Sequence, residues 1–143
     1  MPKLKIVSFI KASPEKVFEY VTVYGEKGIL NKEAFEEKCG KVERQEGNVI
    51  FTKEGDKASE ESVVDWKYSF EYPNMRVMEA LGSKWADRKD TFAASKDCTR
   101  WTVEWRTKIG GLRGTIQFLY FQLRGKRTYH ESVVRPVLEH FQS

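Results

Sequence analysis

The chain has 143 residues, of which 40% are hydrophobic and 32% are charged, which is typical of a soluble globular protein and excludes a disordered one. Its longest apolar run falls well short of the roughly 20 residues that a transmembrane helix needs. The net charge of +4 comes from 25 basic and 21 acidic residues that are interleaved almost everywhere, and the most basic segment, Arg124 to Arg127, has no RNA-binding motif beside it. We therefore expect no membrane insertion and no nucleic-acid partner.

A chain of this length can bury a hydrophobic core without disulfides or metal ions. No repeat or linker interrupts it, so we expect a single domain over residues 1–143. The N-terminal segment from Met1 to Ile6 lacks the apolar region of a secretory signal, which predicts a cytoplasmic protein. Cys39 and Cys98 are too few and too far apart for a disulfide framework, and we expect reduced thiols.

The N-terminal segment predicts one strand followed by two short helices. Residues 3–10 are rich in β-branched and aromatic side chains, which favours a strand. Ser13 is a good N-cap and Pro14 suits the first position of a helix, which we expect to end at Gly25. Asn31 begins a second predicted helix that stops before Gly40. The alternative, that this stretch opens the next strand, is weaker because Glu, Lys and Ala are poor strand formers.

The middle of the chain predicts a series of antiparallel strands. Residues 42–45 and 49–53 flank a short turn that contains Gly47, as in a hairpin. Residues 64–72 and 99–107 alternate between apolar and polar side chains, which indicates strands with one buried aromatic face. Residues 75–81 and about 85–94 predict two further strands between them.

The segment from about Thr115 to Phe141 predicts a long terminal helix. It carries an apolar stripe formed by Ile116, Leu119, Leu123, Val134 and Phe141. His130 also falls within this stripe, and Arg127 lies near its edge. Only this helix is long enough to cover the aromatic face of the predicted sheet. Gly125 and Pro136 are both able to bend it, and a bend would turn His130 away from the sheet.

Two short motifs resemble those of a known superfamily. The stretch from Ile10 to Phe18 resembles the opening signature of the START-like, or SRPBCC, helix-grip superfamily in its polyketide cyclase/dehydrase-like branch. The stretch from Thr99 to Thr102 is similar to the entry of that family's last strand, although Cys98 stands where the family commonly has Gly. The order of the predicted elements agrees with this superfamily over essentially the whole chain.

The resemblance implies an α+β, helix-grip fold. In this fold a curved antiparallel sheet of about seven strands wraps around a long C-terminal helix, and two short helices follow the first strand. It also implies a cavity between the sheet and that helix for a small apolar or amphipathic molecule. The superfamily contains lipid carriers, hormone receptors and a minority of enzymes.

The candidate ligand-binding residues are those that the predicted faces turn toward this cavity. They are Trp66, Tyr68, Phe70, Phe92, Trp101, Trp105, Leu119, Leu123, Arg127, His130 and Val134. Any single one of these aromatic residues is more often a core residue than a ligand contact, whereas as a set they suit a pocket. His130 has the chemistry to bind a ligand or transfer a proton, but a hydrogen-bonded core histidine is the commoner case. Arg127 suits a ligand carboxylate, and a surface arginine is again commoner.

Other kinds of chemistry find little support in the sequence. His130 and His140 have no metal-binding spacing, and no nucleophile elbow or phosphate-binding loop is present, so we expect no metal and no cofactor. Four strand carboxylates are candidates for paired acids, but most alternate onto the outer face, and solvated charges explain them more simply. They are Asp65, Glu71, Asp90 and Glu104.

The sequence therefore predicts a protein that binds a small hydrophobic or amphipathic ligand. One alternative is an enzyme of the cyclase or dehydratase type that uses His130 or Tyr68 as its acid/base group. A second alternative is a module that binds a protein partner. The residues do not decide whether the chain catalyses a reaction or which protein partner it would bind.

Overall fold

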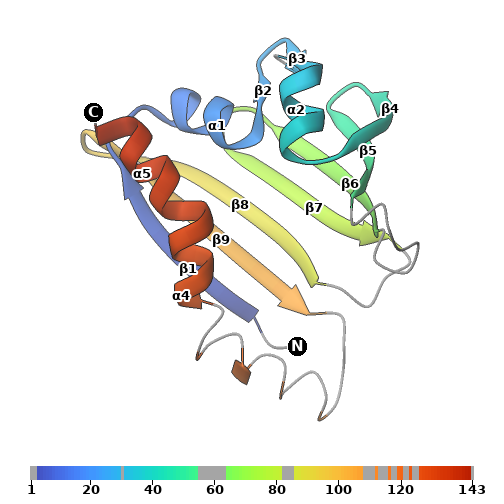
Figure 1. Ribbon diagram of the computed structural model, residues 1–143. Helices are drawn as coiled ribbons and strands as arrows, with labels where there is room; N and C mark the ends of the chain where they lie inside the picture. Colours follow the sequence, from blue (N-terminus) through green and yellow to red (C-terminus); the bar gives the residue numbers. More distant parts are fainter. Residues whose placement is uncertain are drawn as a thin grey trace.

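A seven-stranded antiparallel sheet forms the body of the molecule in the computed structural model, which describes residues 3–29, 31–54, 64–81, 86–107, 112, 116, 119–120, 123 and 126–142 (Figure 1). Its strands are β1 (Lys3–Ile10), β4 (Lys41–Glu46), β5 (Val49–Glu54), β6 (Val64–Glu71), β7 (Met75–Leu81), β8 (Ala86–Ser95) and β9 (Cys98–Thr107). The strand order is β1-β9-β8-β7-β6-β5-β4, so strands adjacent in sequence are neighbours in the sheet except that β1 pairs with β9. The predicted antiparallel sheet of about seven strands is confirmed.

Two helices lie between β1 and β4, as the capping residues predict. They are α1 (Pro14–Thr22) and α2 (Lys32–Lys38), and the short strands β2 (Tyr24–Gly25) and β3 (Gly28–Ile29) lie between them. The Ser13 hydroxyl accepts a hydrogen bond from the Lys16 backbone N–H at 3.4 Å, and the Asn31 side chain accepts one from the Ala34 N–H at 3.2 Å. Both N-caps were therefore correctly predicted.

The end of α1 differs from the prediction. The helix ends at Thr22, and Val23 takes the left-handed conformation with φ 57°, so Gly25 is not the exit residue. A β-branched residue rarely adopts this conformation. The Thr22 hydroxyl supports the turn, because it donates to the Phe18 carbonyl at 2.7 Å and accepts from the Tyr24 N–H at 3.2 Å.

The turn from β8 to β9 explains how the chain accommodates Cys98 where the resembling family commonly has Gly. Lys96 carries the positive φ of this turn, at 53°. The described non-glycine residues with positive φ are Val23 and Lys96, so Cys98 does not take the left-handed conformation, and its thiol donates to the Ser95 carbonyl at 3.0 Å. A side chain is thus tolerated there.

The C-terminal helical segment is continuous over the described residues 126–142. It consists of α4 (Lys126–Tyr129), a π-helical turn η3 (His130–Val134) and α5 (Arg135–Gln142). Figure 1 shows it in red, crossing one face of the sheet near β1 and β9. The predicted start at Thr115 and the predicted bend at Gly125 lie outside the described residues.

The π turn shifts the phase of this helix by one residue. The backbone N–H of Arg135 bonds to the carbonyl of His130, five residues earlier instead of four. Pro136 follows directly, and a proline in a regular helix lacks this donor and clashes with the carbonyl four residues before it. Counting back five residues from the buried Val134 gives Tyr129, which packs against the core, whereas His130 is exposed.

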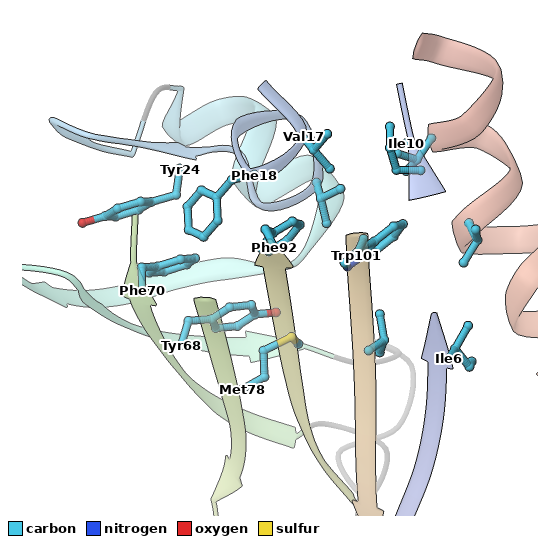
Figure 2. Close-up of a cluster of buried hydrophobic side chains, with 14 of the residues drawn as sticks. Ile6, Ile10, Val17, Phe18, Tyr24, Tyr68, Phe70, Met78, Phe92 and Trp101 are labelled. Carbon is cyan, nitrogen blue, oxygen red and sulfur yellow. The ribbon is translucent and has the colours of Figure 1, made fainter. Parts of the chain in front are cut away.

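The hydrophobic core lies between the sheet and the three helical elements. Phe18 of α1 is fully buried and makes edge-on contacts with four aromatic rings, three of which are labelled beside it in Figure 2 as Tyr24, Phe70 and Phe92. Those rings belong to Tyr24, Phe70, Tyr72 and Phe92. Phe35 of α2 is also fully buried and contacts Tyr68. The expectation that the terminal helix alone covers the aromatic face is therefore wrong, because α1 and α2 cover part of it.

Candidate ligand-binding cavity

A cavity of about 370 Å³ lies between the sheet, the α1 and α2 helices, and the C-terminal helical segment. Its wall is formed by Tyr20, Val21, Lys38, Cys39, Tyr68, Arg76, Met78, Arg88, Trp101, Ser132, Val133, Pro136 and Val137. Most of this lining is apolar or aromatic, with polar groups from the sheet and from α2. A volume in the range of about 300–1,000 Å³ with such a lining suits a small organic molecule.

Two arginines reach the cavity because of the alternation along β7 and β8. On β7, Arg76, Met78 and Ala80 are the buried positions, two residues apart. On β8, Asp90 is fully buried between Arg88 and Phe92 on the same face. The register places Arg76 opposite Asp90, and Met78 opposite Arg88. The sheet thus gathers two guanidinium groups around one carboxylate.

Asp90 accepts four hydrogen bonds within this cluster. Arg88 binds it through Nε at 2.8 Å and Nη2 at 2.9 Å, as a two-pronged pair. Arg76 Nη2 donates at 3.1 Å and the Trp101 indole N–H at 2.9 Å. Burial alone would raise the pKa of Asp90, but the two guanidinium groups and these hydrogen bonds outweigh it and hold this pKa below its usual value. Asp90 is therefore ionised.

Arg88 is held in place by aromatic side chains as well as by Asp90. Its guanidinium carbon lies 5.5 Å from the ring centres of both Trp105 and Tyr129. Burial lowers the pKa of Arg88, but the Asp90 carboxylate outweighs this and raises it above its usual value. Burial also raises the pKa of the Tyr129 hydroxyl to about 12. The buried Tyr129 hydroxyl and Trp105 indole N–H make no hydrogen bond with the described residues, and the charge of Arg88 partly opposes the rise in the pKa of Tyr129.

The cluster carries more positive than negative charge. Among the described residues, Asp90 is the acidic partner that Arg76 and Arg88 share, which leaves one positive charge in excess within this part of the chain. The side chains of Arg76 and Asp90 are only 4% and 0% exposed, so water does little to screen this charge. Arg76 Nε is buried and makes no hydrogen bond within the described part of the chain. Among the described residues that line the cavity, none is an Asp or a Glu.

Lys38 adds a third basic group to the cavity wall. Its ammonium donates to the carbonyls of Tyr20 at 3.1 Å and Val21 at 3.0 Å, near the end of α1. Burial and then the charge of Arg76 lower the pKa of Lys38. The side chain as a whole is exposed, so it lies at the rim of the cavity.

The predicted site residues from the sheet lie on the core side, but only two of the six line the cavity. Tyr68 and Trp101 do so, and Figure 2 shows Tyr68 beside Met78. Phe70 and Phe92 are buried in the aromatic core around Phe18. The other two are half-buried: Trp66 lines a second hollow near β4 and β5, and Trp105 packs against Arg88.

The predicted site residues from the terminal helix are placed differently. Val134 is fully buried in the core, as expected. The inward direction expected for the other four was wrong, because Leu119 and Leu123 are 50% and 83% exposed, and Arg127 and His130 are exposed as well. For His130 the physical reason is the π turn, which puts Tyr129 in the position that a regular helix would give to His130.

The interpretation of Asp90 as a solvated strand charge was also wrong. Asp90 is fully buried, whereas Asp65 and Glu71 are exposed and Glu104 is half-buried. The signal that was missed is the alternation itself, because an inward Phe92 requires an inward Asp90 and Arg88 on the same strand. The same spacing on the preceding strand would have indicated Arg76.

Two further properties of the described residues bear on function. No three His, Cys, Asp or Glu side chains in the described ranges lie close enough together to hold a metal ion. Among the helices that the structure describes, none has the length and apolar character needed to cross a bilayer.

Comparisons with known proteins identify the fold. No protein-family model matches the chain, and no curated protein matches it in sequence. Among solved structures, TTHA0849 from Thermus thermophilus matches with a TM-score of 0.61 at 15% identity, over 99% of this chain and 97% of that chain. Ara h 8.0201 matches with a TM-score of 0.52 at 11% identity, over 96% of this chain and 98% of that chain.

A third solved structure is the di-domain ARO/CYC StfQ from the steffimycin biosynthetic pathway. It matches with a TM-score of 0.56 at 9% identity, over 98% of this chain and 50% of that chain. At these identities the likeness establishes the fold and no activity. The chain thus has the α+β helix-grip, START-like fold that its motifs and element order predict.

Proposed function

We propose that this protein binds one small amphipathic molecule in the cavity between the curved sheet and the C-terminal helical segment. The observation that carries the proposal is the 370 Å³ cavity, which opens beside a well-packed core and has both apolar and charged walls. Apolar area supplies affinity, and a few polar groups orient the ligand. The helix-grip fold supports the proposal, since the resembling superfamily places its ligands between the same elements.

The experiment uses a neutral fluorescent probe, N-phenyl-1-naphthylamine, which emits strongly in apolar surroundings. Titration of the purified chain should give saturable emission with about one site per chain. A phenylalanine in place of Val133, which is half-buried in the cavity wall, fills part of the space. Val133→Phe should weaken binding at least tenfold, at an overpacking cost to stability of about 1–3 kcal/mol.

The matched control is Val7→Phe, which makes the same substitution on the outer face of β1, where Val7 is 39% exposed. This variant should bind the probe as the wild-type chain does. Absence of saturable binding, or equal binding by Val133→Phe and the wild type, would contradict the proposal. Native mass spectrometry of freshly purified protein provides an independent check, since a co-purified ligand adds a discrete mass.

A further inference from the structure

The polar end of the cavity has a specific charge pattern that the proposed function leaves unexplained. The two buried arginines carry two positive charges, and Asp90 is the only acidic partner that either makes among the described residues. Arg88 uses two of its nitrogens on Asp90, so that pair is balanced by itself. The excess positive charge therefore belongs to Arg76.

Arg76 has donor capacity that the described part of the chain does not use. Its Nη2 donates to Asp90, whereas its Nε is a buried donor without a partner among the described residues. A buried donor that bonds neither protein nor water is unfavourable. Arg76 also lines the cavity with a side chain that is 4% exposed. An anionic ligand at this end of the cavity would offset the excess charge of Arg76 through the part of the guanidinium that lines the cavity, since Nε itself is buried.

The remaining walls define what surrounds such an acceptor. Lys38 lies at the rim and adds positive charge near the same end. Tyr20, Val133 and Val137 contribute apolar surface from the two opposing helical elements. The cavity is therefore cationic at the sheet and apolar along the helices.

We infer that the ligand is an amphipathic monoanion whose carboxylate binds Arg76, with its apolar body between Trp101 and Val137. This inference rests on the proposed function, because it concerns the same cavity. Arginine favours a carboxylate for its planar geometry and its permanent charge. Asp90 is a positioning residue in this arrangement, since it fixes both guanidinium groups and does not contact the ligand.

Two probes of equal chain length, decanoate and 1-decanol, test the charge of the ligand directly. Each competes with N-phenyl-1-naphthylamine on the wild-type chain at pH 8, where decanoate is ionised. Decanoate should displace the fluorophore at a concentration at least tenfold lower than decanol. Equal displacement by the two probes would overturn the inference and leave the proposed function intact, whereas failure of the fluorophore itself to bind would overturn both.

The variant Arg76→Met tests the assignment to this residue. It leaves the balanced Arg88–Asp90 pair and the Trp101 hydrogen bond in place, so the chain is expected to fold. Its preference for decanoate over decanol should fall to less than threefold, with the affinity for decanol unchanged. Arg76→Lys keeps the charge without the planar group and should retain part of the preference.

The control is Arg100→Met, which removes an exposed arginine from β9 and should keep the full preference. A preference that survives in Arg76→Met would overturn the assignment to Arg76. The wild-type comparison of the two probes needs no variant, so the inference remains testable if Arg76→Met does not fold.

Discussion

The substitution Asp90→Asn removes the carboxylate that binds the guanidinium groups of both Arg76 and Arg88. Asparagine has nearly the same shape, but it offers one acceptor oxygen and places N–H donors against the donors of Arg76 and Arg88. The structure gives Asp90 no exposure and four hydrogen bonds, three of them from charged groups. The variant therefore leaves two buried positive charges without a counter-charge.

Removal of one partner from a buried ion pair costs about 3–5 kcal/mol in the free energy of unfolding. For a chain of about this length each kcal/mol lowers the melting temperature by roughly 2–4 °C, so we expect a decrease of about 6–20 °C. The loss is a large part of the roughly 5–15 kcal/mol that holds a typical domain folded. Part of the chain population is then unfolded at moderate temperature.

Urea unfolding followed by tryptophan fluorescence measures this loss, since Trp101 donates to Asp90 and reports on the cluster. The control is Asp65→Asn, the same chemical change at an exposed position of β6, which should alter the unfolding free energy by no more than about 0.5 kcal/mol. If Asp90→Asn were also within about 1 kcal/mol of the wild type, the carboxylate would not be the counter-charge of the two arginines.

Three further predictions concern pH and packing. The pKa of Asp90 is lower in the folded state, so the stabilisation by its carboxylate is present above about pH 4 and is lost as the pH falls through the folded pKa. The unfolding free energies of the wild type and Asp90→Asn should therefore converge in acid. A difference between the two that stays constant down to pH 2 would contradict this. Burial raises the pKa of Tyr129 to about 12, so the contribution of its neutral hydroxyl to the free energy of unfolding is lost as the pH rises from 10 to 12. In alkaline denaturation measurements, Tyr129→Phe should lose less stability than the wild type over that interval. Equal losses in the two proteins would contradict the raised pKa of Tyr129. Phe18→Ala removes a fully buried ring with four aromatic neighbours and should cost about 3–5 kcal/mol in urea unfolding, against less than about 0.5 kcal/mol for the exposed Arg100→Ala.

The elements of the fold were largely predictable from local signals. Ser13 and Asn31 cap the two short helices, and the alternation of β6 and β9 marks two strands with an aromatic face. These signals depend on a few neighbouring residues, so the sequence displays them directly. The packing of α1 on this aromatic face was not predictable in the same way, because it depends on contacts between Phe18 and residues distant in sequence, Phe70 and Phe92.

The candidate site was less predictable than the fold. The regular spacing of the aromatic residues on the strands predicts that they share a buried face. The same pattern does not by itself indicate that Arg76 and Asp90 are buried, because charged side chains on strands are usually solvated. Their burial results from pairing across β7 and β8, a long-range contact that composition does not reveal. His130 was misplaced for a different reason, because helical periodicity assumes a constant pitch and the π turn breaks it.

The π turn is equivalent to a single inserted residue in an α-helix, and this has a consequence for chain length. Ser132 and Val133 of this turn form part of the cavity wall, Val134 anchors the helix in the core, and Val137 belongs to both. Deletion of Ser132 would place Val134 four residues after Tyr129, as α-helical pitch requires, but it would also put Pro136 into a regular helix, where its ring clashes with the carbonyl four residues earlier. Cavity shape in this protein therefore depends on the residue count of this turn, because that count decides which side chains of the helix face the sheet.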